Sequence, residues 1–236
     1  MKKILLSLVI LFASTMLVSA QTVDEIATKH IAAMGGEEKL RSVKSLVMDI
    51  SLSVMGMDLE NKTSLIVNTA MLNTTKIMDD EMIQAFDGET AWWKRPTMMG
   101  GTGEPEVMPD EMAKGAVSQT VAFSFLDYKT DGSKLELIGT EKVKGADAYH
   151  LKSTAKSGYV FDAWIDANSN FITKYMVELA GEKQEIFYSN YKTIDGIIFS
   201  HTMTTTNPQA GEMVFETKKI TINPTLDLAM FKFNKK

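Results

Sequence analysis

The chain contains no cysteine, so it can form no disulfide and offers no cysteine nucleophile. Arginine is scarce, with only Arg41 and Arg95, and the formal net charge at pH 7 is −5. A mildly acidic surface argues against binding to nucleic acid and against electrostatic docking on anionic lipid. We therefore expect no nucleic-acid partner, and a fold that is stable through its own packing.

Residues 1–20 have the pattern of a secretory signal peptide. Lys2 and Lys3 form a basic start, residues 4–18 are almost wholly apolar, and cleavage is expected after Ala20. The apolar run is short for a membrane span, and no stop-transfer segment follows, so we expect no transmembrane anchor in the mature chain. No cysteine follows the cleavage point, so the chain cannot be acylated there. We expect an exported, soluble mature chain of residues 21–236, whose formal charge is −7 without the two lysines.

Recognisable catalytic and cofactor motifs are also missing. The histidines His30, His150 and His201 are far apart in the sequence and form no HExxH pattern. Neither a GxSxG nucleophile motif nor a glycine-rich phosphate loop occurs. We therefore expect a protein that is not an enzyme and that holds neither a metal nor a cofactor.

Two weaker patterns leave alternatives open. His201 and Met203 share one face of an expected strand, which would permit a soft-metal site for copper. Asp162 and Asp166 share a face of another expected strand with Trp164 between them, as in a sugar-facing patch or a glycosidase pair. Ordinary packing and a solvated strand face explain these residues more simply.

The hydrophobic pattern changes from helical to strand periodicity near residue 45. Thr22 can cap a helix that ends at Gly35-Gly36, and a second short helix is expected at about residues 37–43. From Leu46 to Val54 every second residue is apolar, which predicts a strand with one buried face. Further strands are expected at residues 59–70, 72–79, 81–86, 89–95, 134–143, 147–155, 158–166, 170–180, 183–192, 196–206 and 212–222.

Residues 96–109 interrupt this pattern with prolines and glycines and predict a long loop, a type of segment that often carries function. A helix is expected next, at about residues 110–125. About eleven or twelve strands with so few helices form a sheet that must curl or split. The prediction is a mainly β (α+β) fold: one strongly curved antiparallel sheet with helices on its concave side.

Four stretches together resemble a known family: AAMGGEEKLRSVKSL (32–46), IQAFDGETAWW (83–93), YKTIDGIIFSH (191–201) and INPTLDLAMFKF (222–233). In their order and spacing they are similar to the periplasmic outer-membrane lipoprotein-sorting proteins, the LolA/LolB-like group. The resemblance spans nearly the whole mature chain, and it implies one LolA/LolB-like lipid-binding domain over residues 21–236. It also implies a half-open β-barrel of about 11 strands with a hydrophobic cavity for acyl chains.

The same resemblance implies a function and partners. Since the acylated cysteine of the membrane-bound members is absent, the chain looks like a soluble periplasmic carrier of lipid or lipoprotein acyl chains, acting towards the outer membrane. Its partners would be inner- or outer-membrane sorting proteins. The alternative is a structural or protein-interaction module of the same fold without lipid cargo.

The expected ligand-binding residues are apolar and line the cavity and its lid. Fifteen methionines remain after Met1 and Met16 are removed, and flexible methionines suit a wall that accepts varied acyl chains. Adjacent Trp92 and Trp93 must point to opposite faces of their strand. The predicted cavity and lid residues are Met48, Ile50, Leu52, Val54, Phe86, Trp92, Met98, Met99, Met112, Val117 and Phe123.

Overall fold

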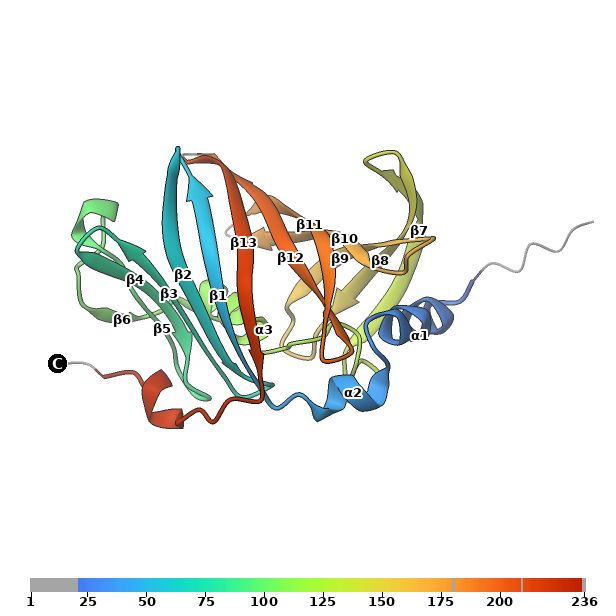
Figure 1. Cartoon of the computed structure of the whole chain (residues 1–236), viewed down its shortest axis with the longest axis horizontal. Helices are drawn as coiled ribbons and strands as arrows, with labels where there is room; N and C mark the ends of the chain where they lie inside the picture. Colours follow the sequence, from blue (N-terminus) through green and yellow to red (C-terminus); the bar gives the residue numbers. More distant parts are fainter. Residues whose placement is uncertain (1–20, 180, 209, 235–236) are drawn as a thin grey trace, which may run out of the picture.

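The structure is a computed structural model that describes residues 21–179, 181–208 and 210–234. The expected signal peptide, residues 1–20, lies outside the described residues. A single sheet of thirteen antiparallel strands dominates the fold and curves into a half-open barrel (Figure 1). Along the sheet the strands follow the order β6-β5-β4-β3-β2-β1-β13-β12-β11-β10-β9-β8-β7, and the edges β6 and β7 are not paired with each other.

The strand bounds agree with the sequence-based prediction to within a few residues, and one additional strand is present. The strands are β1 (Ser45–Val54), β2 (Met57–Ile66), β3 (Ala70–Ile77), β4 (Asp80–Phe86), β5 (Ala91–Lys94), β6 (Pro105–Val107), β7 (Lys134–Val143), β8 (Ala146–Thr154), β9 (Val160–Asp166), β10 (Ile172–Leu179), β11 (Glu182–Ile194), β12 (Ile197–Asn207) and β13 (Gly211–Ile222). The predicted mainly β fold with one curved antiparallel sheet is confirmed.

The first two helices form as their capping residues predict. Helix α1 (Val23–Ala33) begins at a capping box, in which the Thr22 hydroxyl accepts from the Glu25 amide. Helix α2 (Glu37–Ser42) follows after a turn at Gly35. A side chain at Gly35 would place its Cβ 2.7 Å from the Gly196 carbonyl oxygen, so glycine lets this turn dock against the β11–β12 turn.

The segment between β5 and β7 differs from its prediction. The expected loop 96–109 contains a short 3₁₀ helix, η1 (Thr97–Met99), and β6, which pairs with β5. The expected helix 110–125 is shorter: α3 (Asp110–Ser118) ends where the Ser118 and Thr120 hydroxyls donate to the Gly115 and Val117 carbonyls. Such local bonds compete with helix continuation, so residues 119–133 cross the inner face as an irregular segment.

Two hydrophobic cores lie on the inner face of the sheet. The first joins β1–β5, β12 and β13 to α2, α3 and Phe123. The second joins β8–β10 to Ile26 and Ala27 of α1 and to Phe125. Helix α3 contacts β3, β4 and β5 on one side and β10 on the other, so it bridges the two halves of the half-barrel (Figure 1).

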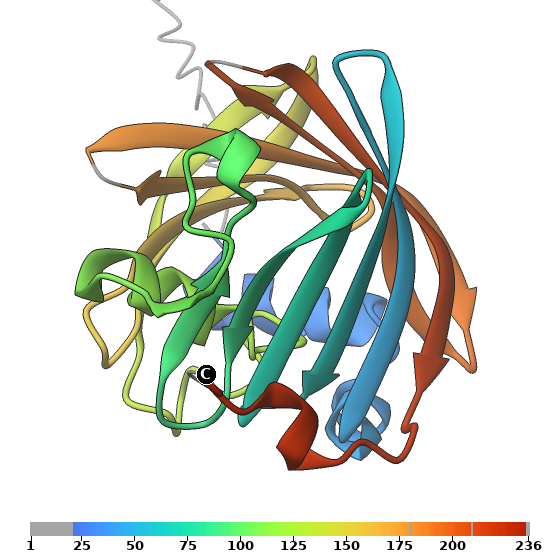
Figure 2. The ribbon, with the colours of Figure 1, turned by 90° about the vertical axis from the view of Figure 1, so that its left-hand side faces the viewer.

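The outer face of β3–β5 is covered by the C-terminal segment. The 3₁₀ helix η2 (Leu228–Phe231) packs there, and the Trp92 indole donates a 2.9 Å hydrogen bond to the Phe231 carbonyl. The Phe231 side chain is fully buried. Figure 2 shows this segment passing outside the strands, close to the C-terminus.

Candidate functional site

Cross-strand pairing arranges the inner face of the sheet in rows of side chains. The innermost row is apolar and belongs to the first core: Leu46 pairs with Leu65, Leu65 with Met71, Met71 with Phe86, and Phe86 with Ala91. Because side chains alternate along each strand, the inner face continues at every second residue. Further rows of inner-facing side chains therefore follow one another from the first core towards the β1–β2 and β3–β4 turns.

Beyond the first core, the inner face of β1, β13, β12 and β11 carries an apolar strip. Leu52 pairs with Phe215, Phe215 with Met203, and Val54 with Met213. We define the apolar strip as Ile50, Leu52, Val54, Ile186, Met203, Met213 and Phe215. Among the described residues, none of these seven is a member of either hydrophobic core.

The members of the apolar strip are incompletely covered by the protein itself. Leu52 is buried, with 4% of its surface exposed, but the other six side chains keep partial exposure. Partly exposed apolar side chains on the inner face of a curved sheet are typical of a surface that receives an apolar ligand. The apolar strip is therefore the part of the inner face best suited to hold hydrocarbon.

Tyrosines border the apolar strip on the β10–β11 side. Burial raises the pKa of Tyr188 to about 12, yet the side chain keeps partial exposure. Burial also raises the pKa of Tyr175, whose hydroxyl is hydrogen-bonded to Ser124. Both phenol groups lie deep in the half-barrel and remain partly accessible. Their hydroxyls therefore place hydrogen-bonding groups beside the apolar surface.

A polar belt replaces the apolar strip on β2, β3 and β4. The Asn61 amide donates to Asn73 at 2.9 Å and to Thr75 at 2.8 Å, and the Asn73 amide donates to Thr63 at 2.7 Å. Asn61 and Thr75 are buried, so these bonds satisfy groups that water cannot reach. Gln84, the next residue of this belt, pairs with Asn73 on one side and Trp93 on the other.

The predicted residues of β1 fall on the inner face. Ile50, Leu52 and Val54 belong to the apolar strip, and Met48 packs against the edge of the first core. Phe86, Met112 and Phe123 are parts of that core, and Phe123 packs at 5.9 Å from the Phe199 ring centroid. Val117 is half-buried on α3.

Trp92 lies on the face opposite to the predicted wall. It pairs with Ala85 under the C-terminal segment and hydrogen-bonds to Phe231, whereas Trp93 packs against the first core. The alternation of the two tryptophans was predicted, but the sequence does not show that residues near 231 return to cover the outer face. Trp93 is therefore the inner-facing residue of the pair.

Sequence reasoning missed four members of the apolar strip: Ile186, Met203, Met213 and Phe215. Each lies in a strand that was predicted correctly, and alternation along the strand would have placed it on one of two faces. The missing information is the pairing of β1 with β13, the most distant pairing along the chain.

Exposed methionines gather at the free hairpin tips of β1–β5. Met55 and Met78 are 71% and 78% exposed in the β1–β2 and β3–β4 turns, and Met98 and Met99 are 64% and 52% exposed in η1. Antiparallel pairing places these three tips at the same end of the sheet. The predicted lid residues Met98 and Met99 thus lie at the rim of the half-barrel.

The irregular segment that crosses the inner face is held at its far end by ion pairs. Arg41 of α2 lies 2.6 Å from an Asp127 carboxylate oxygen and also donates to the Leu126 carbonyl. Lys129 lies 2.9 Å from Asp24 of α1. These contacts are largely solvent-exposed, which makes them weak and reversible attachments.

The outer face of β7–β11 carries a charged and aromatic cluster. The two ring nitrogens of His150 lie 2.9 Å from Glu141 and 2.7 Å from Asp162, and the ring stacks on Trp164 at 4.2 Å. Hydrogen bonds from Trp164 and His150 hold the pKa of Glu141 below its usual value. Every group is thus bound by its neighbours, which is typical of a structural network.

The structure separates the residues of the possible carboxylate pair, Asp162 and Asp166, and buries His201 of the possible soft-metal site. Asp162 faces this cluster, whereas Asp166 accepts hydrogen bonds from Ser169 and Asn168 in a turn, so the two carboxylates serve separate local networks. His201 is buried, and its Nδ1 lies 3.1 Å from the Phe199 carbonyl oxygen. Within the described ranges, no group of three or more histidine, aspartate or glutamate residues could hold a metal ion.

Two neighbouring hollows on the outer face lie over β8–β13 in the described part of the chain. One of about 550 Å³ is lined mainly by Lys144, Met176, Lys183, Phe187 and Glu212, and a neighbouring hollow of about 210 Å³ shares Met176 and Lys183. Lys144 lies 4.4 Å from the Phe187 ring centroid. Salt-bridged and cation-covered surfaces of this kind are poorly suited to hydrocarbon.

Solved structures share this fold. A domain described as an outer membrane lipoprotein-sorting protein from Vibrio parahaemolyticus has a TM-score of 0.58 at 15% identity, covering 89% of this chain and 97% of its own. A LolA superfamily protein from Nitrosomonas europaea has a TM-score of 0.59 at 14% identity, covering 91% and 99%. A DUF1329 family protein from Desulfovibrio piger has a TM-score of 0.58 at 14% identity, covering 90% and 98%. The chain therefore has a LolA-like fold.

No protein-family model matches the sequence. No curated protein matches it either. Among the described residues, no helix is both long and apolar enough to cross a membrane.

Proposed function

We propose that this chain is an exported, non-enzymatic carrier that holds acyl chains of lipids or lipoproteins against the inner face of its sheet. The single observation that carries the proposal is the apolar strip, which lies on the inner face and outside both cores. The LolA-like fold supports it, since one similar structure is described as a lipoprotein-sorting domain. The signal-peptide pattern of residues 1–20 supports export, and together with the LolA-like fold it supports a periplasmic carrier that acts towards the outer membrane.

The energetics of the apolar strip suit a carrier. Each methylene that leaves water for an apolar surface gains about 0.8 kcal/mol, so several acyl carbons give useful affinity. Met203 and Met213 add flexible, polarizable side chains that adapt to chains of different shape. A wall of this kind selects for hydrocarbon without demanding one particular acyl group.

Loading and release require the inner face to open. Helix α3 and residues 119–133 cross that face and are attached at their far end by the exposed pairs of Arg41 with Asp127 and Lys129 with Asp24. The loop 96–109 lies before α3, and its exposed Met98 and Met99 lie at the rim of the half-barrel. We propose that α3 and these two segments form the movable cover, and that membrane sorting proteins meet the carrier at this rim.

The proposal is tested on the apolar strip with a matched control on the outer face. We expect the Met203→Gln and Met213→Gln double variant to bind a fluorescent fatty acid at least about tenfold more weakly, because two amides replace apolar contacts. Met176→Gln makes the same chemical change on the outer face and should bind as the original chain does. Fluorescence titration measures the affinity of each variant for the fatty acid, and circular dichroism confirms that each variant is folded.

Co-purified lipid gives an independent test. Native mass spectrometry and lipid extraction of freshly exported protein should find acyl species bound to the chain. Repeated absence of lipid, together with equal probe affinity in the strip and control variants, would contradict a carrier. That outcome would favour the protein-interaction module, which the core positions of Met112 and Phe123 also fit.

A further inference from the structure

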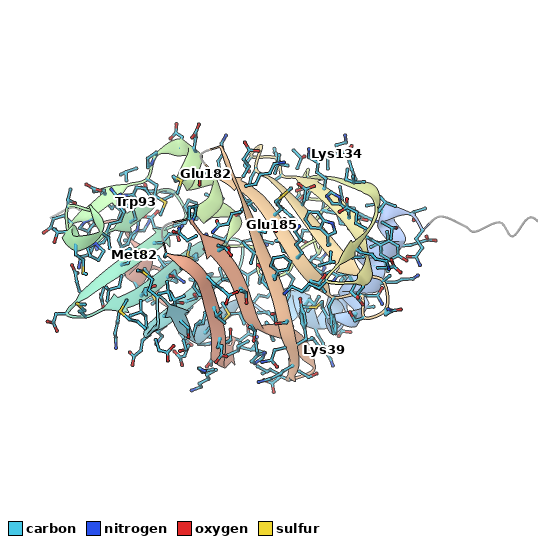
Figure 3. All side chains as sticks on the ribbon, turned by 90° about the horizontal axis from the view of Figure 1, so that it is seen from above. Lys39, Met82, Trp93, Lys134, Glu182 and Glu185 are labelled. Carbon is cyan, nitrogen blue, oxygen red and sulfur yellow. The ribbon has the colours of Figure 1, made fainter. Side chains whose placement is uncertain are left out.

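One guanidinium stands at the rim end of the polar belt. Arg95 follows β5 directly, and its guanidinium carbon lies 4.5 Å from the ring centroid of Trp93, the inner-facing tryptophan. Figure 3 labels Trp93 and, on the neighbouring strand β4, Met82. Stacking on an aromatic ring holds a guanidinium in one orientation, so Arg95 presents a positioned positive charge beside the inner face.

The hydrogen-bonding capacity of Arg95 is largely unused. A terminal nitrogen lies 3.4 Å from a Glu106 carboxylate oxygen, which is a long and single contact. The Nε atom is buried and has no hydrogen-bond partner among the described residues. A guanidinium has five N–H donors in a planar fork that matches a carboxylate or a phosphate, and a buried donor without a partner is costly.

A second polar group near Trp93 is also available. Gln84 pairs directly with Trp93 across β4 and β5, and its side-chain amide makes no hydrogen bond to any part of the described chain. On the other side of Trp93 the register places Glu106. The backbone here is fixed, because a Cβ on Gly101 would lie 2.1 Å from the Arg95 carbonyl oxygen and the Gly103 amide donates to that same oxygen.

These groups lie four strands from the apolar strip on β1, at a spacing of about 4.8 Å per strand. An acyl chain on the apolar strip and a headgroup beside Trp93 would lie on the same inner face, about 19 Å apart along the sheet, with the polar belt of β2–β4 between them. On the premise of the proposed acyl carrier, we propose that Arg95 and Gln84 bind the anionic headgroup, a carboxylate or a phosphate ester, of an amphiphilic acyl ligand. The headgroup displaces the long contact with Glu106 and uses the free Nε donor.

The test compares three ligands with the same sixteen-carbon chain, which is long enough for this span: hexadecanoate, hexadecyl phosphate and hexadecanol, each in competition with a fluorescent acyl probe at pH 7.5. We expect the anionic ligands to bind about tenfold more tightly than hexadecanol, as charge-assisted hydrogen bonds predict. Whichever anion binds more tightly identifies the headgroup as carboxylate or phosphate ester. Equal affinities for all three ligands would overturn the proposal and leave the carrier function intact.

Variants separate a headgroup contact from a structural role. Arg95→Gln should bring the affinity for the anions down to that for hexadecanol without weakening the binding of hexadecanol itself, and Arg95→Lys should keep part of the preference. Glu106→Gln should raise the affinity for anions, because it removes a competing carboxylate. Lys94→Gln, which removes the neighbouring charge paired with Asp80, should leave the preference unchanged. An equal loss for all ligands in Arg95→Gln would overturn the proposal, and a chain that binds none of the three would refute the carrier function as well.

Discussion

Asp87 shows how one residue connects a turn to the far end of the chain. Its carboxylate accepts from the Thr90 and Glu89 amides within the β4–β5 turn and from the Phe233 amide of the C-terminal segment. Burial alone would raise the pKa of Asp87, but these backbone hydrogen bonds and the nearby Lys232 outweigh burial, so the pKa lies below its usual value. The ionised carboxylate therefore stabilises the folded state.

We expect Asp87→Asn to lower the free energy of unfolding at pH 7 by about 2 kcal/mol, because hydrogen bonds to a buried charge are lost. A lowered carboxyl pKa gives stability that is present above the unfolded value near 3.9 and is lost as pH falls through the folded value. The difference in the free energy of unfolding between the original chain and the Asp87→Asn variant should therefore shrink below about pH 4. Urea unfolding of both chains at several pH values from 7 to 2.5 measures this difference. A difference that stays constant with pH would show that the ionisation of Asp87 does not cause the loss of stability.

At the scale of elements, Arg41 joins α2 to the segment that crosses the inner face. Its guanidinium contacts Glu37, Asp127 and the Leu126 carbonyl. The side chains of Arg41 and Glu37 are 44% and 64% exposed, so solvent screens their ion pair, and the pair of Arg41 with Asp127, which is 33% exposed, is only moderately protected. The ion pairs of Arg41 therefore contribute little to the stability of the fold. Because Arg41 holds the far end of residues 119–133, it is well placed to control the opening of the proposed cover.

We expect Arg41→Gln to speed the release of a bound fluorescent fatty acid several-fold while leaving the urea midpoint of unfolding nearly unchanged, because exposed ion pairs contribute little to stability. Stopped-flow displacement by excess dodecanoate measures the release rate. Lys76→Gln removes an exposed pair with Glu60 on β2 and serves as the matched control. Unchanged release in Arg41→Gln would show that the segment does not limit exchange.

At the scale of the whole molecule, the apolar strip lies on the inner face of the half-barrel and outside both hydrophobic cores. A ligand that binds only the folded state stabilises it by about 2.7 kcal/mol at one hundred times its dissociation constant. For a domain of this size that corresponds to a rise in Tm of about 5–10 °C.

We therefore expect dodecanoate to raise the Tm of the original chain, and to raise it much less in the Met203→Gln and Met213→Gln double variant. Differential scanning calorimetry at several ligand concentrations measures both. A Tm that does not move at saturating ligand would count against binding on the inner face.

Local patterns were sufficient for most of the elements. The alternation from Leu46 to Val54, the Thr22 cap and the Asp87-Gly88 turn act over a few residues, so the sequence alone predicts them. The prediction was less accurate between residues 96 and 125. There α3 ends at the local hydrogen bonds of the Ser118 and Thr120 hydroxyls, and β6 pairs with β5, a contact that no periodicity within residues 105–107 indicates.

The sequence by itself determined the antiparallel β character, the positions of nearly all strands and the inner-facing set of β1, because side-chain alternation is a property of each strand. Only the tertiary structure decided that β13 returns beside β1, that the C-terminal segment covers Trp92, and that polar residues of β2–β4 continue the inner face beside the apolar strip. These features depend on contacts between residues far apart in the chain, and no periodicity within one strand records which distant strand becomes its neighbour.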